Sequence, residues 1–135
     1  MCLGNICRSP MAEGAFRVAA LEQEFSFHVD SAGTASYHVG SQPDPRAIAV
    51  ASLNGIDITG QSARQIERDD FYRFSHIIAM DRANLEGLRA RAPRDEAQRL
   101  ASKAAVLDRQ NGHPLQGQFL QPTRAGRGLL GCGAV

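Results

Sequence analysis

The chain lacks the features of an exported, membrane-spanning or nucleic-acid-binding protein. No apolar run approaches the about 18 residues that a membrane-spanning helix needs, and no charged-then-apolar leader opens the sequence. A formal charge of only +1 predicts neither a nucleic-acid partner nor a membrane partner. Three cysteines in 135 residues are too few for a disulfide framework. We therefore expect a small protein of the cytoplasm.

Acidic residues are absent from residues 109–135, where glycine takes six of the last twenty-four positions. This stretch shows neither helical nor strand periodicity. We therefore expect one folded domain over residues 1–108 and an atypical tail over residues 109–135. The tail is interpreted as disordered or as the product of a frameshift near residue 108.

The sequence does contain a phosphate-binding pattern near its start. Five residues separate Cys2 from Arg8, and Ser9 and Pro10 then lead into a helix-forming stretch. Five residues suffice to curl a backbone around a tetrahedral anion with its amide groups pointing inward. The helix that follows adds its positive end, with Ser9 predicted as its N-cap and Pro10 as its first residue.

The residue types in this loop fit nucleophilic attack on a phosphoryl group. A cysteine beside an arginine and a helix N-terminus favours its thiolate, so Cys2 is the candidate nucleophile. The planar guanidinium of Arg8 can clamp two phosphoryl oxygens. Ser9 can donate its hydroxyl proton to the sulfur as the sulfur leaves. Together the three residues predict a phosphocysteine intermediate.

Strand-like and helical patterns alternate along the rest of the chain. We expect strands over 25–29, 76–80 and 104–107, and helices over 10–20, 44–53 and 81–91. Alternation of this kind predicts a parallel sheet covered on both faces, with the ligand at the carboxyl ends of the strands. The four histidines, His28, His38, His76 and His113, lack the spacing of metal ligands, so neither a metal nor another cofactor is expected.

The run CLGNICRSPMAEG resembles the signature of the low-molecular-weight protein tyrosine phosphatases. Further blocks follow in that family's order at residues 30–34, 37–40, 43–47, 63–66 and 79–85, so the resemblance runs from residue 2 to about residue 94. It implies a three-layer α/β fold with a small parallel sheet and helices on both faces. It also implies hydrolysis of phosphotyrosine in proteins or of small aryl phosphates, with inorganic phosphate as a further ligand.

The resemblance assigns a role to each matching residue. Cys2, Arg8 and Ser9 would be catalytic, as nucleophile, phosphate clamp and hydrogen-bond donor. The substrate-binding residues would be Leu3, Gly4, Asn5, Ile6 and Cys7 of the loop, with Tyr37 stacking on the substrate ring at its rim. Asn5 would hold the strained shape of the loop, and Cys7 could form a reversible disulfide with Cys2. Ser31 and Asp81 match supporting positions.

Two other activities of similar proteins fit less well. Arsenate reductases need further redox cysteines in mid-chain, whereas the third cysteine here is Cys132. Protein-arginine phosphatases carry a threonine where this chain has Ile6. The bulky apolar side chain of Ile6 narrows the pocket and offers no hydroxyl to a guanidinium, which favours a phosphotyrosine substrate.

The sequence departs from the resemblance at both ends. Relatives begin with a central β-strand that delivers the nucleophile, and we interpret Met1 as a misassigned start inside a longer reading frame. Relatives also carry a late Asp-Pro-aromatic segment that supplies the general acid, which is not found here. Asp108 is a less favoured substitute. The alternatives are therefore an impaired phosphatase that only binds phosphate or phosphotyrosine, or a remnant that does not fold.

Overall fold

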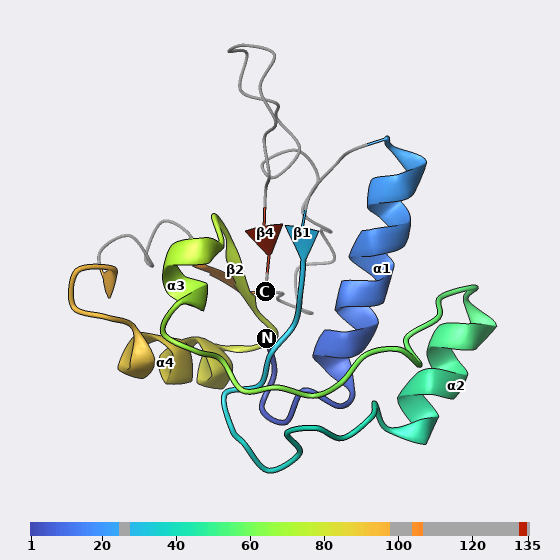
Figure 1. Ribbon diagram of the computed structural model, residues 1–135, viewed down its shortest axis with the longest axis horizontal. Helices are drawn as coiled ribbons and strands as arrows, with labels where there is room; N and C mark the ends of the chain where they lie inside the picture. The colour runs from blue at the N-terminus through green and yellow to red at the C-terminus, as the bar shows by residue number, and fades with distance from the viewer. Residues whose placement is uncertain (25–27, 98–103, 107–132, 135) are drawn as a thin grey trace.

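The computed structural model describes residues 1–24, 28–97, 104–106 and 133–134. Along the chain these residues form α1 (Arg8–Glu22), β1 (His28–Val29), α2 (Pro45–Leu53), α3 (Asp70–Arg73), β2 (Ile77–Ala79), α4 (Arg82–Arg91), β3 (Ala104–Val106) and β4 (Gly133–Ala134). Helices α1 and α2 lie on one side of the strands, and α3 and α4 lie on the other (Figure 1). This arrangement confirms the predicted α/β fold.

The strands pair in parallel, as the alternation of strands and helices predicts. β1 pairs with β4, and β2 pairs with β3. The first two residues of the chain lie between these pairs: the Met1 amine donates to the Ile78 carbonyl at 2.6 Å, and the Met80 amide donates to the Met1 carbonyl at 2.8 Å. On the other side Cys2 forms a parallel bridge with Gly33. Cys2 therefore lies between the two strand pairs.

Capping residues and apolar runs explain most of the elements. The Asp44 carboxylate accepts the Arg46 amide at the start of α2, and Asp81 accepts the Asn84 amide at the start of α4. Gly55 follows α2 with a φ of 72°, which glycine tolerates at a helix end. The short apolar run of β2 is buried throughout. The predicted helices over 44–53 and 81–91 and the predicted strand over 76–80 are confirmed to within one or two residues.

Two local predictions about helix α1 need correction, and two short elements, β4 and α3, had no prediction from the sequence. Helix α1 begins at Arg8, two residues before the predicted start, and Ser9 is not its N-cap because the Ser9 hydroxyl is bonded inside the preceding loop. β4 is a short strand within the tail, where no periodicity predicted one, because two residues are too few to show a pattern. α3 was not predicted. Part of the strand expected over 25–29, most of the tail and Asp108 lie outside the described residues.

Two apolar clusters hold the described elements together. The larger one lies between the strands and helices α3 and α4, and it contains Phe71, Phe74, Ile77 and Leu88, each no more than 2 % exposed. The smaller one joins α1 and α2 through Ala47, Ala51 and Ile58. Because Met1 belongs to the larger cluster and Cys7 packs on the smaller one, the loop between them is anchored at both ends.

Candidate active site

The loop from Cys2 to Arg8 is held by hydrogen bonds that its carbonyl groups accept from surrounding segments. Three neighbouring backbone amides donate to them: Thr34 to Cys2 at 2.9 Å, Ala35 to Leu3 at 2.9 Å, and Asp44 to Ile6 at 2.7 Å. The amide of Asn5 points to the other side and donates to the Cys2 sulfur over 3.3 Å. A curled backbone whose amides face inward is a concave site for an anion. Helix α1 begins at Arg8, so its N-terminus lies at the end of this loop.

Asn5 holds the tightest point of this loop. Its φ of 56° is a left-handed conformation, which costs a non-glycine residue about 1–2 kcal/mol and which asparagine tolerates better than most. The side chain is buried and fully engaged. Its Oδ1 accepts the Arg64 backbone amide at 2.9 Å, and its Nδ2 donates to Ser9 Oγ at 2.9 Å and to Ser31 Oγ at 2.8 Å.

These bonds fix the direction of the hydrogen bond at the nucleophile. Because Asn5 Oδ1 accepts an N–H group, the Asn5 amide cannot be flipped, and both of its protons go to hydroxyl oxygens. Ser9 therefore accepts from Asn5 and keeps its own proton for another partner. The Cys2 sulfur lies 3.0 Å from Ser9 Oγ, and because a thiolate has no proton, Ser9 is the donor to the ionised form of Cys2. A donor to sulfur favours the thiolate form.

The two thiols of the loop are shifted in opposite directions. Burial opposes ionisation of Cys2, but hydrogen bonds from the Ser9 side chain and from the backbone amides of Ser9 and Asn5 outweigh it and hold the pKa of Cys2 below its ordinary value. Burial, and then the nearby Asp44 carboxylate, raise the pKa of Cys7. Both thiols are free. Of the two thiols, the site therefore favours ionisation of Cys2 over that of Cys7.

Arg8 stands at the first turn of α1 and is oriented from α4. Its Nη1 donates to Asp81 Oδ2 over 2.6 Å, and the two side chains are 40 % and 39 % exposed. The hydrogen bond from Arg8, with the Asn84 amide, keeps the pKa of Asp81 below its usual range, so the pair stays charged. A guanidinium with one nitrogen so held has two more nitrogens for an oxyanion.

The rim of the loop exposes apolar and aromatic groups. Leu3 is 54 % exposed and Tyr37 is 78 % exposed. The segment that carries Tyr37 touches the loop, since a Cβ built on Gly4 would lie 2.9 Å from the His38 ring. Ile6 is half-buried within the loop. An exposed aromatic side chain in a segment that contacts the loop suits a ligand that combines a phosphate with a ring.

The structure therefore brings Cys2, Asn5 and Ser9 into direct contact and orients Arg8, while Cys7 faces α2. Sequence reasoning did not anticipate the contacts of Arg64, whose only signal was its place in one of the matching blocks. No cluster of three or more metal-ligating side chains occurs among the residues that the structure describes. Within the same residues, no helix has both the length and the apolar character needed to cross a bilayer.

Comparisons with known proteins place these features in a family. The model of the family described as "Low molecular weight phosphotyrosine protein phosphatase" matches residues 1–111. A curated protein of that name from Schizosaccharomyces pombe is 49 % identical over 92 residues, which cover 65 % of this chain and 58 % of the yeast protein. The chain thus spans little more than half the length of this relative.

Solved structures of similar fold include more than one activity by name. A protein tyrosine phosphatase from Entamoeba histolytica, crystallised with Hepes in its active site, matches with a TM-score of 0.71 and 36 % identity, covering 78 % of this chain and 65 % of the other. A structure titled as a Drosophila arginine phosphatase matches with a TM-score of 0.65 and 33 % identity over the same shares of the two chains.

Proposed function

The chain belongs to the low molecular weight phosphotyrosine protein phosphatase family, and we propose that it hydrolyses phosphotyrosine in proteins through a phosphocysteine intermediate. The observation that carries the proposal is the contact of the Cys2 sulfur with the Ser9 hydroxyl, in a loop whose Asn5 amide also points at the sulfur. We further propose that residues 1–108 form the phosphatase domain and that it works in the cytoplasm. The match of the family model to residues 1–111 supports the domain boundary.

The first chemical step forms the S–P bond. The Cys2 thiolate attacks phosphorus, the P–O bond to the tyrosine ring breaks, and the phenolic oxygen leaves with the electron pair of that bond. Charge that develops on the equatorial oxygens is met by the loop amides, by the α1 N-terminus and by Arg8. Asp81 holds Arg8 in place for this contact. Tyr37 stacks against the ring of the substrate.

The second step hydrolyses the phosphocysteine. Water attacks phosphorus, the S–P bond breaks, and the electron pair returns to sulfur as a thiolate. Ser9 stabilises that leaving thiolate because its hydroxyl already donates to the sulfur. Inorganic phosphate is the product. No Asp or Glu occurs in residues 109–135 to protonate the phenolic oxygen, and loss of a general acid costs about 10²–10⁴-fold in rate.

Ile6 supports phosphotyrosine rather than phosphoarginine as the substrate. Its side chain is apolar and half-buried in the loop, so it offers no hydrogen bond to a guanidinium. The arginine phosphatase among the structural matches shares the fold, and fold alone does not decide between the two substrates. We expect hydrolysis of phosphotyrosine peptides to exceed that of phosphoarginine peptides by at least about 10-fold, the range that one pocket contact can supply.

The acid-free tail supports a second candidate function, which is capture of phosphate or phosphotyrosine without turnover. Aryl phosphates with good leaving groups separate the two. A phosphatase short of acid catalysis turns over nitrophenyl phosphate and has a much larger defect on phenyl phosphate, relative to an intact relative. A binder releases a single burst of nitrophenol and then stops. Equal defects on the two substrates would contradict the proposed acid deficiency, and turnover unchanged by Cys2→Ser would contradict the proposed mechanism.

A further inference from the structure

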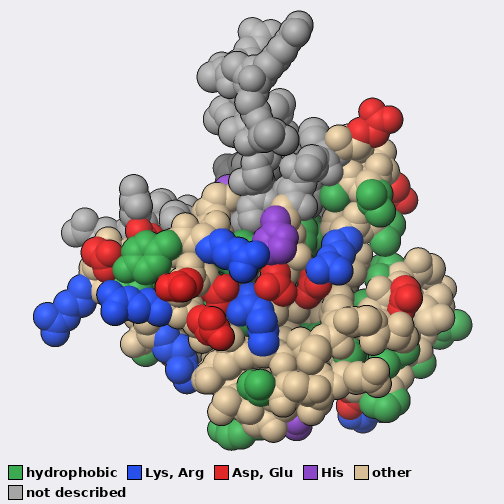
Figure 2. Space-filling model, viewed as in Figure 1, with side chains coloured by type: hydrophobic (Ala, Val, Ile, Leu, Met, Phe, Trp, Pro, Cys, Tyr) green, Lys and Arg blue, Asp and Glu red, His purple; other side chains and the backbone are tan. Residues whose placement is uncertain are grey.

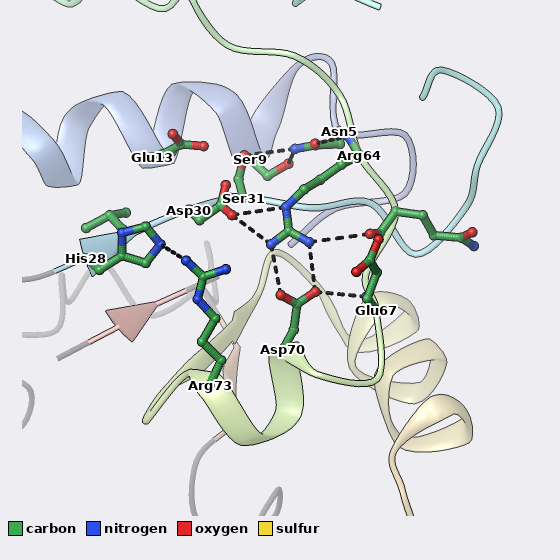
Figure 3. A network of polar contacts seen from close by, with 12 residues as sticks. Asn5, Ser9, Glu13, His28, Asp30, Ser31, Arg64, Glu67, Asp70 and Arg73 are labelled. Atoms are coloured by element: carbon green, nitrogen blue, oxygen red, sulfur yellow. Dashed lines mark hydrogen bonds and ion pairs between the residues drawn. The ribbon is translucent and has the colours of Figure 1, made fainter. Parts of the chain in front are cut away.

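Arg64 lies outside the phosphate loop and is held by two carboxylates (Figure 3). Its Nε donates to Asp30 Oδ2 at 3.0 Å, and its Nη2 lies 2.9 Å from the same oxygen. Its Nη1 donates to Asp70 Oδ2 at 2.8 Å, and its Nη2 donates to Asp70 Oδ1 at 3.2 Å. The Arg64 side chain is only 28 % exposed and that of Asp70 is 6 % exposed. A planar fork can make all of these bonds at once, which an ammonium group cannot.

The two carboxylates join Arg64 to segments on either side of it. Asp30 also accepts the backbone amide of Ser31 at 2.8 Å, and Asp70 accepts the amide of Glu67 at 2.8 Å, just before α3. Figure 3 shows Arg64 between these two segments. Ion pairs removed from water are weak evidence for stability, because desolvation offsets much of their attraction. Stability alone therefore does not explain why Arg64 makes so many well-aligned bonds with Asp30 and Asp70.

The backbone of Arg64 reaches the nucleophile through two side chains. Its amide donates to Asn5 Oδ1, and that bond opposes a flip of the Asn5 amide group. With Asn5 so oriented, Nδ2 donates to Ser9, and the Ser9 proton is directed to the Cys2 sulfur. If Asn5 flipped, its Oδ1 would instead accept the proton of Ser9, and Cys2 would lose its donor.

We propose that Arg64, clamped by Asp30 and Asp70, is a positioning residue that sets the thiolate population of Cys2 through Asn5 and Ser9. The clamp, together with the backbone bond from the Gly33 amide to the Arg64 carbonyl, fixes the place of the Arg64 amide. The amide then orients Asn5, and Asn5 directs the proton of Ser9. The consequence for catalysis depends on the proposed phosphatase function. The consequence for the ionisation of Cys2 does not depend on that function. The positioning role and the phosphatase function can therefore fail separately.

Other ionisable groups around Cys2 are the same in every variant that tests this proposal. They are the Met1 amine, whose pKa burial lowers to about 6, then Cys7, Arg8 with its partner Asp81, and Glu13 with its partner Arg17 behind Ser31. On the face that carries α3, acidic and basic side chains are interleaved (Figure 2), so no single-signed patch dominates the potential there. Arg64→Lys keeps the positive charge and removes the fork, so it separates the contacts of Arg64 from its charge.

The test is the pH dependence of Cys2 alkylation by iodoacetamide, with the modified cysteine identified by peptide mass. The variants are Arg64→Ala, Arg64→Lys and Asp70→Asn in the 135-residue chain. Arg64→Ala is expected to lower the rate about 10-fold at pH 6 and to leave the plateau rate above pH 9 unchanged, which is a shift of about one pKa unit. Arg64→Lys and Asp70→Asn should lie between Arg64→Ala and the unaltered chain.

Arg73→Ala is the matched control. Arg73 lies on α3 and donates to His28, and it does not contact Asn5 or Ser9. It should leave the midpoint of the pH profile unchanged. The proposal is overturned when folded Arg64→Lys and Asp70→Asn keep the midpoint of the unaltered chain, or when only the plateau rate changes. If the midpoint shifts but the unaltered chain shows no phosphatase turnover, the positioning role stands and the proposed function fails.

Discussion

At the residue scale, Gly33 shows how closely a neighbouring segment supports the phosphate loop. Its amide donates to Arg64 and its carbonyl accepts from Ile66, so it pairs with the segment that holds Asn5. A Cβ at this position would lie 2.7 Å from the Leu3 oxygen and 3.3 Å from the Asn5 nitrogen. Both are backbone atoms of the loop. Only a residue without a side chain allows this approach.

We predict that Gly33→Ala displaces the loop. The overpacking should lower the free energy of unfolding by about 1–3 kcal/mol. Activity on nitrophenyl phosphate should fall at least about 10-fold, because the amides and Cys2 move relative to the substrate. Steady-state kinetics and urea denaturation measure the two effects. Gly60→Ala is the control, since no atom lies within 4 Å of a Cβ there, and equal losses in both variants would contradict this account of the loop.

At the scale of elements, the sequence predicted the helices and the strand whose signals lie in neighbouring residues. Two helices were located by their caps, Asp44 and Asp81, and one strand, β2, by its apolar run. A helix cap and a buried strand each depend on residues that are adjacent in the sequence. α3 is four residues long and shows no period. Ser9 was wrongly predicted as a cap because its partners, Asn5 and Cys2, belong to a loop whose shape depends on distant segments.

Leu88 is the most deeply buried residue of helix α4, and Leu85 packs on the same apolar cluster. Leu88 is 0 % exposed and packs in the larger apolar cluster with Phe74 and Ile77. We predict that Leu88→Ala lowers the free energy of unfolding by about 2–5 kcal/mol, the usual cost of a cavity in a core. Leu53→Ala at the end of α2 is the control, because Leu53 is 86 % exposed and its loss should cost less than about 0.5 kcal/mol. Similar losses in thermal or urea denaturation would show that this core is not formed.

At the scale of the whole molecule, the candidate site joins segments that are far apart in the chain. Arg64 contacts Asp30 and Asn5 across separations of 34 and 59 residues. Such contacts leave no periodic signal, so the sequence indicated the loop residues and their chemistry but not the network behind them. The loop itself was predictable because Cys2, Arg8 and Ser9 are neighbours in the chain.

Stability should depend on pH with opposite sign for the two loop thiols. The folded pKa of Cys2 is lowered, so the folded state releases its proton first and stability rises with pH until the unfolded thiol also ionises near pH 9. The folded pKa of Cys7 is raised, so the unfolded state releases its proton first and stability falls above about pH 9. Urea denaturation between pH 7 and pH 10 measures both effects.

The variants Cys2→Ala and Cys7→Ala separate these contributions. The free energy of unfolding of the unaltered chain should gain on that of Cys2→Ala as the pH rises toward 9. It should lose relative to that of Cys7→Ala above that pH. A difference of the same sign for both variants would contradict the environments described for the two thiols.

Trapping of the covalent intermediate tests the central claim most directly. The folded chain is mixed with nitrophenyl phosphate, quenched in acid within the first turnover, digested and analysed by mass spectrometry. The account predicts one added phosphoryl group on Cys2 of the unaltered chain. In the Cys2→Ser variant it predicts no phosphoryl group on residue 2 or on Cys7. Release of nitrophenol with the phosphoryl group on another residue, or at an undiminished rate in Cys2→Ser, would contradict it.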